Sequence, residues 1–314
     1  EAHSSEADKS GMKSSTLRSL LCLALLCPLL ACASETFSFG VIARPAHAAT
    51  ASGLLRTAID ETDSDNLAFV VANGIKADDE PCTDVVYNDR HALYESAKNG
   101  LIVSLTSGDW ADCANAMKHS IAIERLRRLR ELFFVGEFSF GQSQIPLSRQ
   151  STIPTFRMYA ENMHWRIGDV LFATINLPSN NNNFQNAAGR NSEYEDRQVA
   201  NNDWLKRLFI TAKASGLNGI VLFCDGNPMA AHTEHDSGIF FGGKRAGYAE
   251  IRHHILKSAA AFHGRILIVH AERNAKPAKG ILWHDNIGTL YAAAPWTKVA
   301  VNPALPQLFA AANR

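Results

Sequence analysis

The sequence has no excess of charge of either sign. Its 31 lysine and arginine residues are matched by 31 aspartate and glutamate residues, so the formal net charge is zero. Non-specific binding to nucleic acid depends on a surplus of positive charge. The balance removes that driving force, and we expect no nucleic-acid partner.

Several short catalytic motifs are also missing. The sequence contains no Gly-x-Ser-x-Gly nucleophile elbow, no Walker phosphate-binding loop and no paired-glycine dinucleotide fingerprint. The segment 239–247 is rich in glycine and positive charge, but it lacks the strand-to-helix context of a phosphate-binding loop. The neighbouring His253 and His254 fall inside a predicted helix, where adjacent side chains point in different directions, so they do not form a chelating pair.

Long apolar runs are limited to the N-terminal region. Lys13 and Arg18 precede the apolar run 20–33, which is too short to span a bilayer comfortably. A positive flank, an apolar run and an exit of small residues are typical of an export signal, and we expect a bacterial-type signal within residues 1–33. The residues before Met12 are polar, and we expect the true start at Met12. No transmembrane segment is expected after the signal is removed.

The end of this run allows two kinds of processing. Cleavage after Ala33 releases a chain that begins at Ser34, and we expect this chain to be periplasmic or secreted. The letters LLAC also resemble a lipobox, which would make Cys32 the lipid-anchored first residue of an outer-membrane lipoprotein. Leu30 fits poorly at its position before that cysteine, so release is favoured.

Cysteine is scarce in the remaining chain. Three of the six cysteines lie in the signal region, which leaves Cys82, Cys113 and Cys224. Export to an oxidising compartment favours pairing. Cys82 and Cys113 follow strand-like segments in polar loops, whereas Cys224 ends an apolar run and is expected to be a core thiol. We predict a disulfide between Cys82 and Cys113, with three free thiols as the alternative.

Strand patterns alternate with helical patterns along the rest of the chain. Short, mostly continuous apolar segments predict buried strands at 37–42, 67–72, 101–105, 170–177, 219–224 and 265–270. Helical periodicity predicts helices at 122–134, 197–216 and 247–264. The asparagine-rich tract 178–196 is expected to be a surface loop. We find no internal repeat and no linker, so residues 34–314 are expected to form one α/β domain.

The order of the motifs carries a family resemblance. The letters NGIKADDEPC, GDWADC, ENMHW, NNNNF and ANNDWL follow one another, with NP after one late strand and VH after the next. In this order the chain resembles the calcineurin-like metallophosphoesterases, specifically a secreted bacterial branch, across nearly all of residues 37–300. The resemblance implies an α/β calcineurin-like sandwich of two mixed β-sheets flanked by helices. The alternation of elements alone would equally suggest a single doubly wound sheet.

The chemical residues of that family are largely missing. The resemblance implies two divalent metals, typically manganese, iron or zinc, held by an aspartate after the first strand, Gly-Asp after the second, an asparagine after the third and later histidines. Here Arg44 follows the first strand, Ile75 follows Gly74 after the second, and Asn274 stands at the second histidine position. Two cations require several carboxylate and imidazole ligands at once, so the matched residues are too few.

Three residues remain as site candidates. His270 and Asp109 are weak metal-ligand candidates, and each has a structural alternative, as a strand-capping histidine and as a turn former beside Gly108. Arg44 is a candidate for bidentate binding of an anion at the vacated cation site. The alternative is that Arg44 only fills the space and pairs with Asp78 or Asp79.

Two functional hypotheses follow from this residue pattern. The first is an exported binding protein that kept the phosphoesterase scaffold, lost the metals and binds a small molecule that contains phosphate. The second is an active metal-dependent phosphoesterase with a divergent dinuclear site. The missing ligands favour the first hypothesis, whereas the overall resemblance and His270 favour the second.

Export is tested directly by N-terminal sequencing of the exported protein. We expect the first residue to be Ser34, or a lipidated Cys32 if the lipobox is used. An exported form that keeps Met12 as its first residue would contradict both forms of processing.

Overall fold

A computed structural model of the chain describes residues 35–185, 191–230, 246–272 and 280–312. The expected export signal and Asn274 lie outside these described residues, as does most of the segment 239–247. The description below concerns the part of the chain that begins at Glu35, which belongs to one unit.

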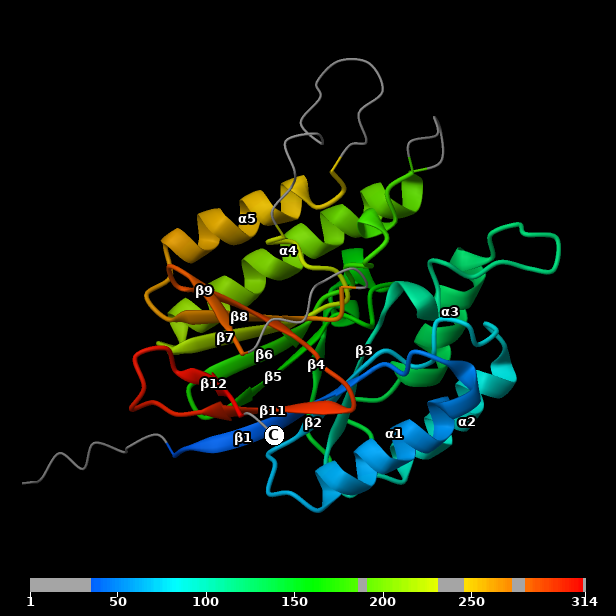
Figure 1. Cartoon of the computed structure of the whole chain (residues 1–314). Helices are drawn as coiled ribbons and strands as arrows, with labels where there is room; N and C mark the ends of the chain where they lie inside the picture. The colour runs from blue at the N-terminus through cyan, green and yellow to red at the C-terminus, as the bar shows by residue number, and fades with distance from the viewer. Residues whose placement is uncertain (1–34, 186–190, 231–245, 273–279, 313–314) are drawn as a thin grey trace, which may run out of the picture. The chain divides into compact units, whose positions relative to one another are not determined.

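The first sheet has five strands in the order β12-β11-β1-β2-β3 (Figure 1). Its strands are β1 (Phe37–Ala43), β2 (Val70–Asn73), β3 (Leu101–Ser104), β11 (Trp296–Val301) and β12 (Phe309–Ala311). β1, β2 and β3 are parallel, whereas β11 runs antiparallel to β1 and β12 antiparallel to β11. The C-terminal part of the chain therefore returns to pair with the first strand.

The second sheet has seven strands in the order β4-β5-β6-β7-β8-β10-β9. Its strands are β4 (Ser148–Arg149), β5 (Met163–Ile167), β6 (Val170–Thr174), β7 (Gly219–Phe223), β8 (Arg265–His270), β9 (Leu282–His284) and β10 (Ile287–Tyr291). β6, β7, β8 and β10 are parallel, and the other strands join this group in antiparallel pairs. Both sheets are therefore mixed.

Helices cover the outer faces of the two sheets (Figure 1). The helices are α1 (Ala48–Asp63), α2 (Asp84–Glu95), α3 (Ala122–Phe133), α4 (Ser192–Ala214) and α5 (Ala249–Ala260). Buried residues of α1, α2 and α3 belong to the core around the first sheet, and those of α4 and α5 pack on the second sheet. The result is a sandwich of two sheets between two layers of helices.

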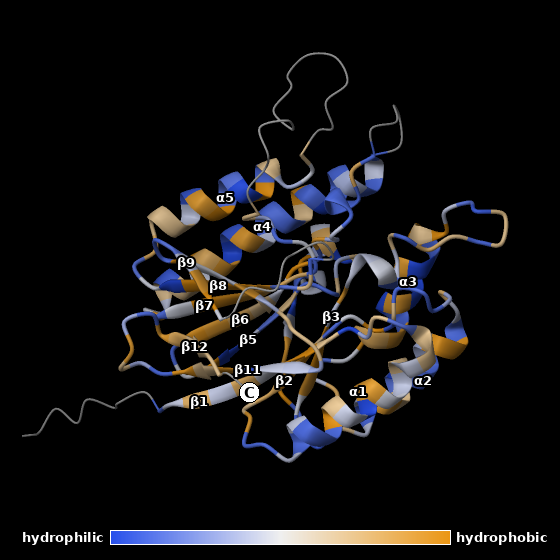
Figure 2. Cartoon of the chain, viewed as in Figure 1, coloured by the Kyte–Doolittle hydropathy of each residue, from blue (hydrophilic) through white to orange (hydrophobic). Residues whose placement is uncertain are grey.

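Aromatic side chains fill the space between the sheets. Phe39 of β1 stacks on Phe69, with ring centroids 5.2 Å apart, and meets Phe172 of β6 edge to face at 5.4 Å. Trp165 of β5 and Phe223 of β7 stack at 5.9 Å. The strands are largely hydrophobic, whereas the helices carry many hydrophilic residues (Figure 2). Burial of large aromatic rings supplies much of the stability of such a core.

The predicted fold class is confirmed, because the strands form two mixed sheets and not one doubly wound sheet. The apolar runs located β1, β3, β6, β7 and β8 to within a few residues. The sequence analysis did not predict α1, α2, β4, β5 or the strands after residue 280. In these segments polar residues interrupt the apolar pattern, so hydrophobic periodicity gives only a weak signal. Much of their burial comes from contacts with residues far away in the chain.

The predicted disulfide between Cys82 and Cys113 is present, and the Cα atoms are 5.9 Å apart. It ties the loop after β2 to the loop after β3, while Cys224 is a buried free thiol. Within the described residues, no helix is both long and apolar enough to cross a membrane.

Removal of the disulfide provides a test of its contribution to stability. The bond closes a loop with a sequence separation of 31, and the chain-entropy model gives about 3–4 kcal/mol for a loop of this length. We expect the double variant Cys82→Ala, Cys113→Ala to lose about this free energy of unfolding in urea titrations. Reduced wild-type protein is the matched control and should lose a similar amount; equal stability of oxidised and reduced protein would contradict the prediction.

Candidate functional site

The loops that follow the parallel strands of the two sheets meet at one edge of the sandwich. The amide nitrogen of Ser107, in the loop after β3, donates a hydrogen bond to Asp225 after β7 at 2.7 Å. The side chain of Asn73, at the end of β2, donates to the carbonyl of Cys224 at 3.2 Å. Parallel strands present their carboxyl ends at the same edge, which is where ligands bind in many α/β proteins. We call this edge the strand-end site.

Asp225 is the central residue of the strand-end site. Its side chain is fully buried, and its Oδ2 atom accepts hydrogen bonds from the amide nitrogens of Ser107 at 2.7 Å and Ser179 at 2.8 Å. The hydroxyl oxygens of Ser107 and Ser179 are 3.0 Å apart. Burial raises the pKa of the Asp225 carboxyl, while Arg44 and the two amide donors act in the opposite direction. One carboxylate therefore joins loops from both sheets.

Arg44 supplies the positive charge of the strand-end site. It directly follows β1, and its side chain is only 10% exposed. Its Nη1 atom lies 3.3 Å from Asp78 Oδ1 and 3.7 Å from Asp225 Oδ1. The sequence analysis offered Asp78 or Asp79 as a partner, and the structure pairs Arg44 with Asp78 and Asp225. Asp79 instead lies 3.7 Å from the exposed His47.

Several buried polar atoms at this edge have no hydrogen-bond partner among the described residues. They are Arg44 Nη1, Asn73 Oδ1, Ser104 Oγ, Asn176 Oδ1 and Asp225 Oδ1. The first and last of these atoms form the ion pair described above. Buried polar atoms without hydrogen bonds are rare in folded proteins and concentrate at functional sites. Among the described residues, the strand-end site therefore contains buried donor and acceptor atoms whose hydrogen-bonding capacity is not used.

Asp109 uses both carboxylate oxygens to hold its own loop. Oδ1 accepts from the amide nitrogens of Ile75 at 2.9 Å and Lys76 at 3.2 Å. Oδ2 accepts from the amide nitrogen and the hydroxyl of Thr106, at 2.7 and 2.9 Å. Burial raises the pKa of Asp109, and these hydrogen bonds oppose the rise. Its carboxylate therefore fastens the loop after β2 to the loop after β3.

His270 ends β8 at the same edge and is buried. Its Nδ1 atom accepts a weak hydrogen bond from the amide nitrogen of Glu272 at 3.4 Å, and its ring lies 5.9 Å from that of Tyr291. Burial lowers the pKa of His270 to about 4. The imidazole is therefore neutral at neutral pH, because burial removes water from its charged form and so disfavours it.

The donors at this edge do not fit a pair of divalent metals. Among the residues that the structure describes, no group of three or more His, Cys, Asp or Glu side chains is placed to hold a metal ion. The Arg44 guanidinium lies beside Asp225, and the Asp109 oxygens are occupied by backbone donors. Two close dications need several anionic or imidazole ligands, and a fixed positive charge between them is unfavourable.

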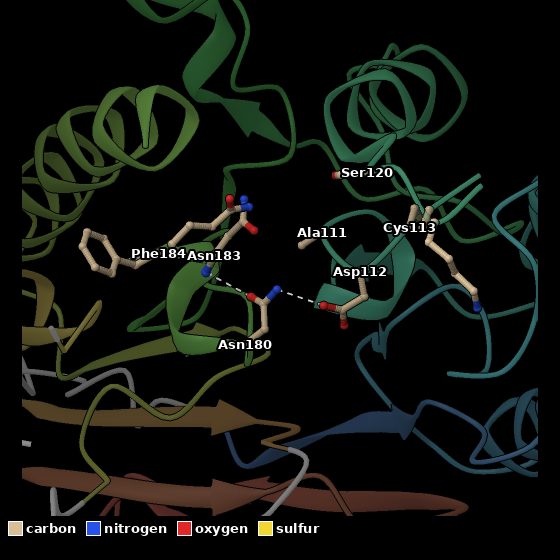
Figure 3. A pocket seen from close by; sticks show the side chains of 10 residues that line it. Ala111, Asp112, Cys113, Ser120, Asn180, Asn183 and Phe184 are labelled. Carbon is tan, nitrogen blue, oxygen red and sulfur yellow. Dashed lines mark hydrogen bonds between the residues drawn. The ribbon is translucent and has the colours of Figure 1, made fainter. Parts of the chain in front are cut away.

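A polar pocket opens beside the strand-end site (Figure 3). Its volume is about 220 Å³, and Asp112, Asn180 and Asn183 are among the residues that line it. The Asn180 side chain donates to Asp112 Oδ1 at 2.9 Å and accepts from the amide nitrogen of Asn183 at 3.0 Å (Figure 3). Asn180 directly follows Ser179, which contacts Asp225. The pocket is therefore linked through the backbone to the strand-end site.

Three consecutive asparagines give this loop an unusual shape. Asn181, Asn182 and Asn183 all have positive φ angles, between 55° and 57°. Asparagine tolerates this left-handed region better than most residues, although a run of three still costs free energy. Hydrogen bonds of the buried Asn182 offset part of that free energy. Its Oδ1 accepts from Arg197 Nη1 at 2.5 Å, and its Nδ2 donates to the carbonyl oxygen of Gly247 at 3.0 Å. This part of the predicted surface loop is therefore built into the fold.

The sequence analysis missed the two charged residues that organise this edge. Asp225 was not among the site candidates, although it follows a buried strand closely, as the other site residues do. Arg197 gave no separate signal, yet it is buried, pairs with Glu193 at 2.6 Å and donates to Asn182. Its guanidinium also lies 5.7 Å from the centre of the Trp110 ring. Glu193 is only four residues away on α4, but Trp110 is far away in the chain, and a partner at that distance cannot be identified from one sequence.

Comparison with known proteins supports the fold alone. No protein-family model matches the sequence, and no curated protein matches it. A solved structure titled "Structure of PhoD" matches with a TM-score of 0.52 and 11% sequence identity. The match covers 85% of this chain and 64% of that chain. PhoD is alkaline phosphatase D and has a metallophosphoesterase-like fold. The chain therefore shares the fold of PhoD, and the match spans less than two thirds of the length of the PhoD chain.

The buried neutral His270 makes stability depend on pH. Its pKa is about 4 in the folded protein, against 6.5 for a histidine free of burial, so the unfolded chain binds a proton first as the pH falls. The contribution of the neutral His270 to the free energy of unfolding is fully present above pH 6.5 and is lost as the pH falls from 6.5 to 4. We expect His270→Gln to reduce the loss between pH 7 and 4.5 by about 2 kcal/mol in urea titrations. The control His284→Gln, at an exposed residue, should leave the loss unchanged; equal losses in all three proteins would contradict the prediction.

Proposed function

We propose that this chain is an exported phosphoesterase-fold protein that binds a small anionic molecule without hydrolysing it. The observation that carries the proposal is the Arg44 guanidinium, which lies between Asp78 and the buried Asp225 where the resemblance places metal chemistry. A guanidinium offers a fixed positive charge and a planar set of donors. It binds oxygen anions without supplying the activated water of a metal centre.

The contacts of Arg44 suggest how an anion reaches it. Asp225 is fully buried and held by two amide donors, whereas Asp78 has a side chain that is 37% exposed. A ligand carboxylate or phosphate would therefore replace Asp78 and leave the Asp225 contact in place. Phosphate groups suit this arrangement because they accept two hydrogen bonds from one guanidinium. A small molecule that contains phosphate is the ligand we propose.

The neighbouring pocket provides room for the remainder of such a molecule. Lys118, Ser120 and Gln185 line it together with Asn180 and Asn183. Amide and hydroxyl groups both donate and accept hydrogen bonds, and an ammonium group donates them, so together they can bind a polar molecule. In the proposed complex, the phosphate of the ligand binds Arg44, and the polar remainder of the ligand lies in the neighbouring pocket.

An active phosphoesterase is the alternative function, and the structural match to PhoD favours it. In that case a divergent set of ligands would hold manganese, iron or zinc with His270. His232 and His235 belong to the sequence but lie outside the described residues, so metal content is a property to measure on the whole chain. Our proposal rests instead on the contacts of Arg44 and Asp109.

The proposed export agrees with the disulfide. Structural disulfides form and persist in oxidising compartments, and Cys82 and Cys113 are bonded here. We therefore propose a periplasmic or secreted location for the chain that follows the export signal.

Metal analysis and phosphatase assays test the loss of catalysis. We expect protein purified without chelators to contain far less than two divalent metals per chain, and to hydrolyse phosphomonoesters and phosphodiesters at the background rate. Arg44→Asp should not restore turnover, because a single new carboxylate leaves the other ligand positions unfilled. A content near two metals per chain, with turnover abolished in His270→Ala, would overturn the proposal and establish the alternative.

A further inference from the structure

A second recessed surface is lined by residues of α4 and α5 and shares no residue with the pocket beside the strand-end site. Figure 1 shows the two helices side by side. The volume of this recessed surface is about 550 Å³, which is within the range of pockets that bind small molecules. α4 and α5 pack side by side on the outer face of the second sheet. We call this surface the α4/α5 groove.

The floor of the α4/α5 groove is apolar. Leu205 and Phe209 line it from α4, and Ala261 lines it just after the end of α5. Leu205 and Phe209 are four residues apart and therefore share one face of the helix. Ile210 also lines the groove and is 56% exposed to solvent. Leu205 and Phe209 are largely buried in the core, so Ile210 is the most exposed of these apolar side chains.

Positive charge surrounds this floor. Lys206, Lys213 and Lys257 line the groove, and no ion pair joins any of them to a carboxylate among the described residues. Lys206 and Lys213 are seven residues apart, which places them on the same face of α4. The carboxylate that lines the groove belongs to Asp203, and Arg207 Nε donates to it at 2.7 Å. The groove therefore combines an apolar floor with a net positive rim.

We propose that the α4/α5 groove binds a single-chain anionic amphiphile. The acyl chain lies over Leu205, Phe209 and Ile210, and the acidic head group contacts Lys206 or Lys257. Burial of methylene groups on the floor supplies affinity, and the ammonium groups select an anionic head over a neutral one. Lysine side chains suit this role because their methylene stems cover apolar surface while the charge stays in water.

The composition of the groove favours this ligand over others. A purely polar molecule would leave the apolar floor unused, and a neutral lipid would leave the three lysines without a counterion. Nucleic acid binding needs a longer basic stripe, and Asp203 and Ile210 interrupt this one. An acidic amphipathic peptide also combines negative charge with an apolar face. Titration with each of the two ligands distinguishes it from a single acyl chain.

Calorimetric titration with sodium dodecanoate below its micelle concentration tests the proposal on the whole exported chain. We expect saturable binding of one dodecanoate per chain, about fourfold weaker for each methylene removed from the ligand. Dodecyl maltoside, which carries the same chain on a neutral head, should bind about tenfold more weakly or not at all.

Surface variants identify the groove as the site. Lys206→Ala with Lys257→Ala should weaken dodecanoate binding about tenfold, and Ile210→Asp should abolish it. The matched controls are Lys98→Ala, which removes another exposed lysine, and Leu282→Ser, at a side chain that is 57% exposed. Both controls should bind as the wild type does. Circular dichroism checks that each variant is folded, and all of these positions are at the surface.

Three results would overturn the proposal. They are absence of dodecanoate binding, binding that the groove variants leave unchanged, and binding of an acidic amphipathic peptide in place of dodecanoate. The α4/α5 groove shares no residue with the strand-end site or its pocket. Failure here therefore leaves the proposed anion-binding function intact, and failure of that function leaves the groove proposal intact.

Discussion

The buried carboxylate of Asp225 is the interaction on which the functional edge depends. It accepts amide hydrogen bonds from the loops after β3 and β6 and faces Arg44 after β1, so one side chain holds loops from both sheets together. A buried carboxylate is costly unless charge and hydrogen bonds compensate it. Arg44 provides that charge and Ser107 and Ser179 provide the hydrogen bonds, so these residues act as a unit.

Further contacts within the protein hold the loops of the strand-end site in place. Two contacts join the loops after β2 and β3: the hydrogen bonds of the Asp109 carboxylate and the Cys82–Cys113 disulfide. Arg197 holds the asparagine turn against α4 through Asn182 and Glu193. Contacts between groups of the protein itself therefore hold the loops of this edge together.

The two proposed ligand surfaces differ in their physical basis. The strand-end site offers buried polar atoms and one guanidinium, which suits a compact anion. The α4/α5 groove offers an apolar floor with lysines at its rim, which suits an amphiphile. They lie on different parts of the sandwich, because the first is formed by strand-end loops and the second by the outer faces of two helices.

The sequence by itself determined six of the apolar strands, the disulfide partners and the absence of the expected aspartates after the first two strands. Those features are local, since a continuous apolar run or a single residue type carries each signal. Only the tertiary structure decided that two sheets form, that Asp225 pairs with Arg44, and that Asp109 serves its own loop. These outcomes depend on contacts between residues far apart in the chain, and more than a hundred positions separate Ser107 from Asp225. Hydrophobic periodicity reports which face of an element is buried, but it does not report which distant side chain meets that face.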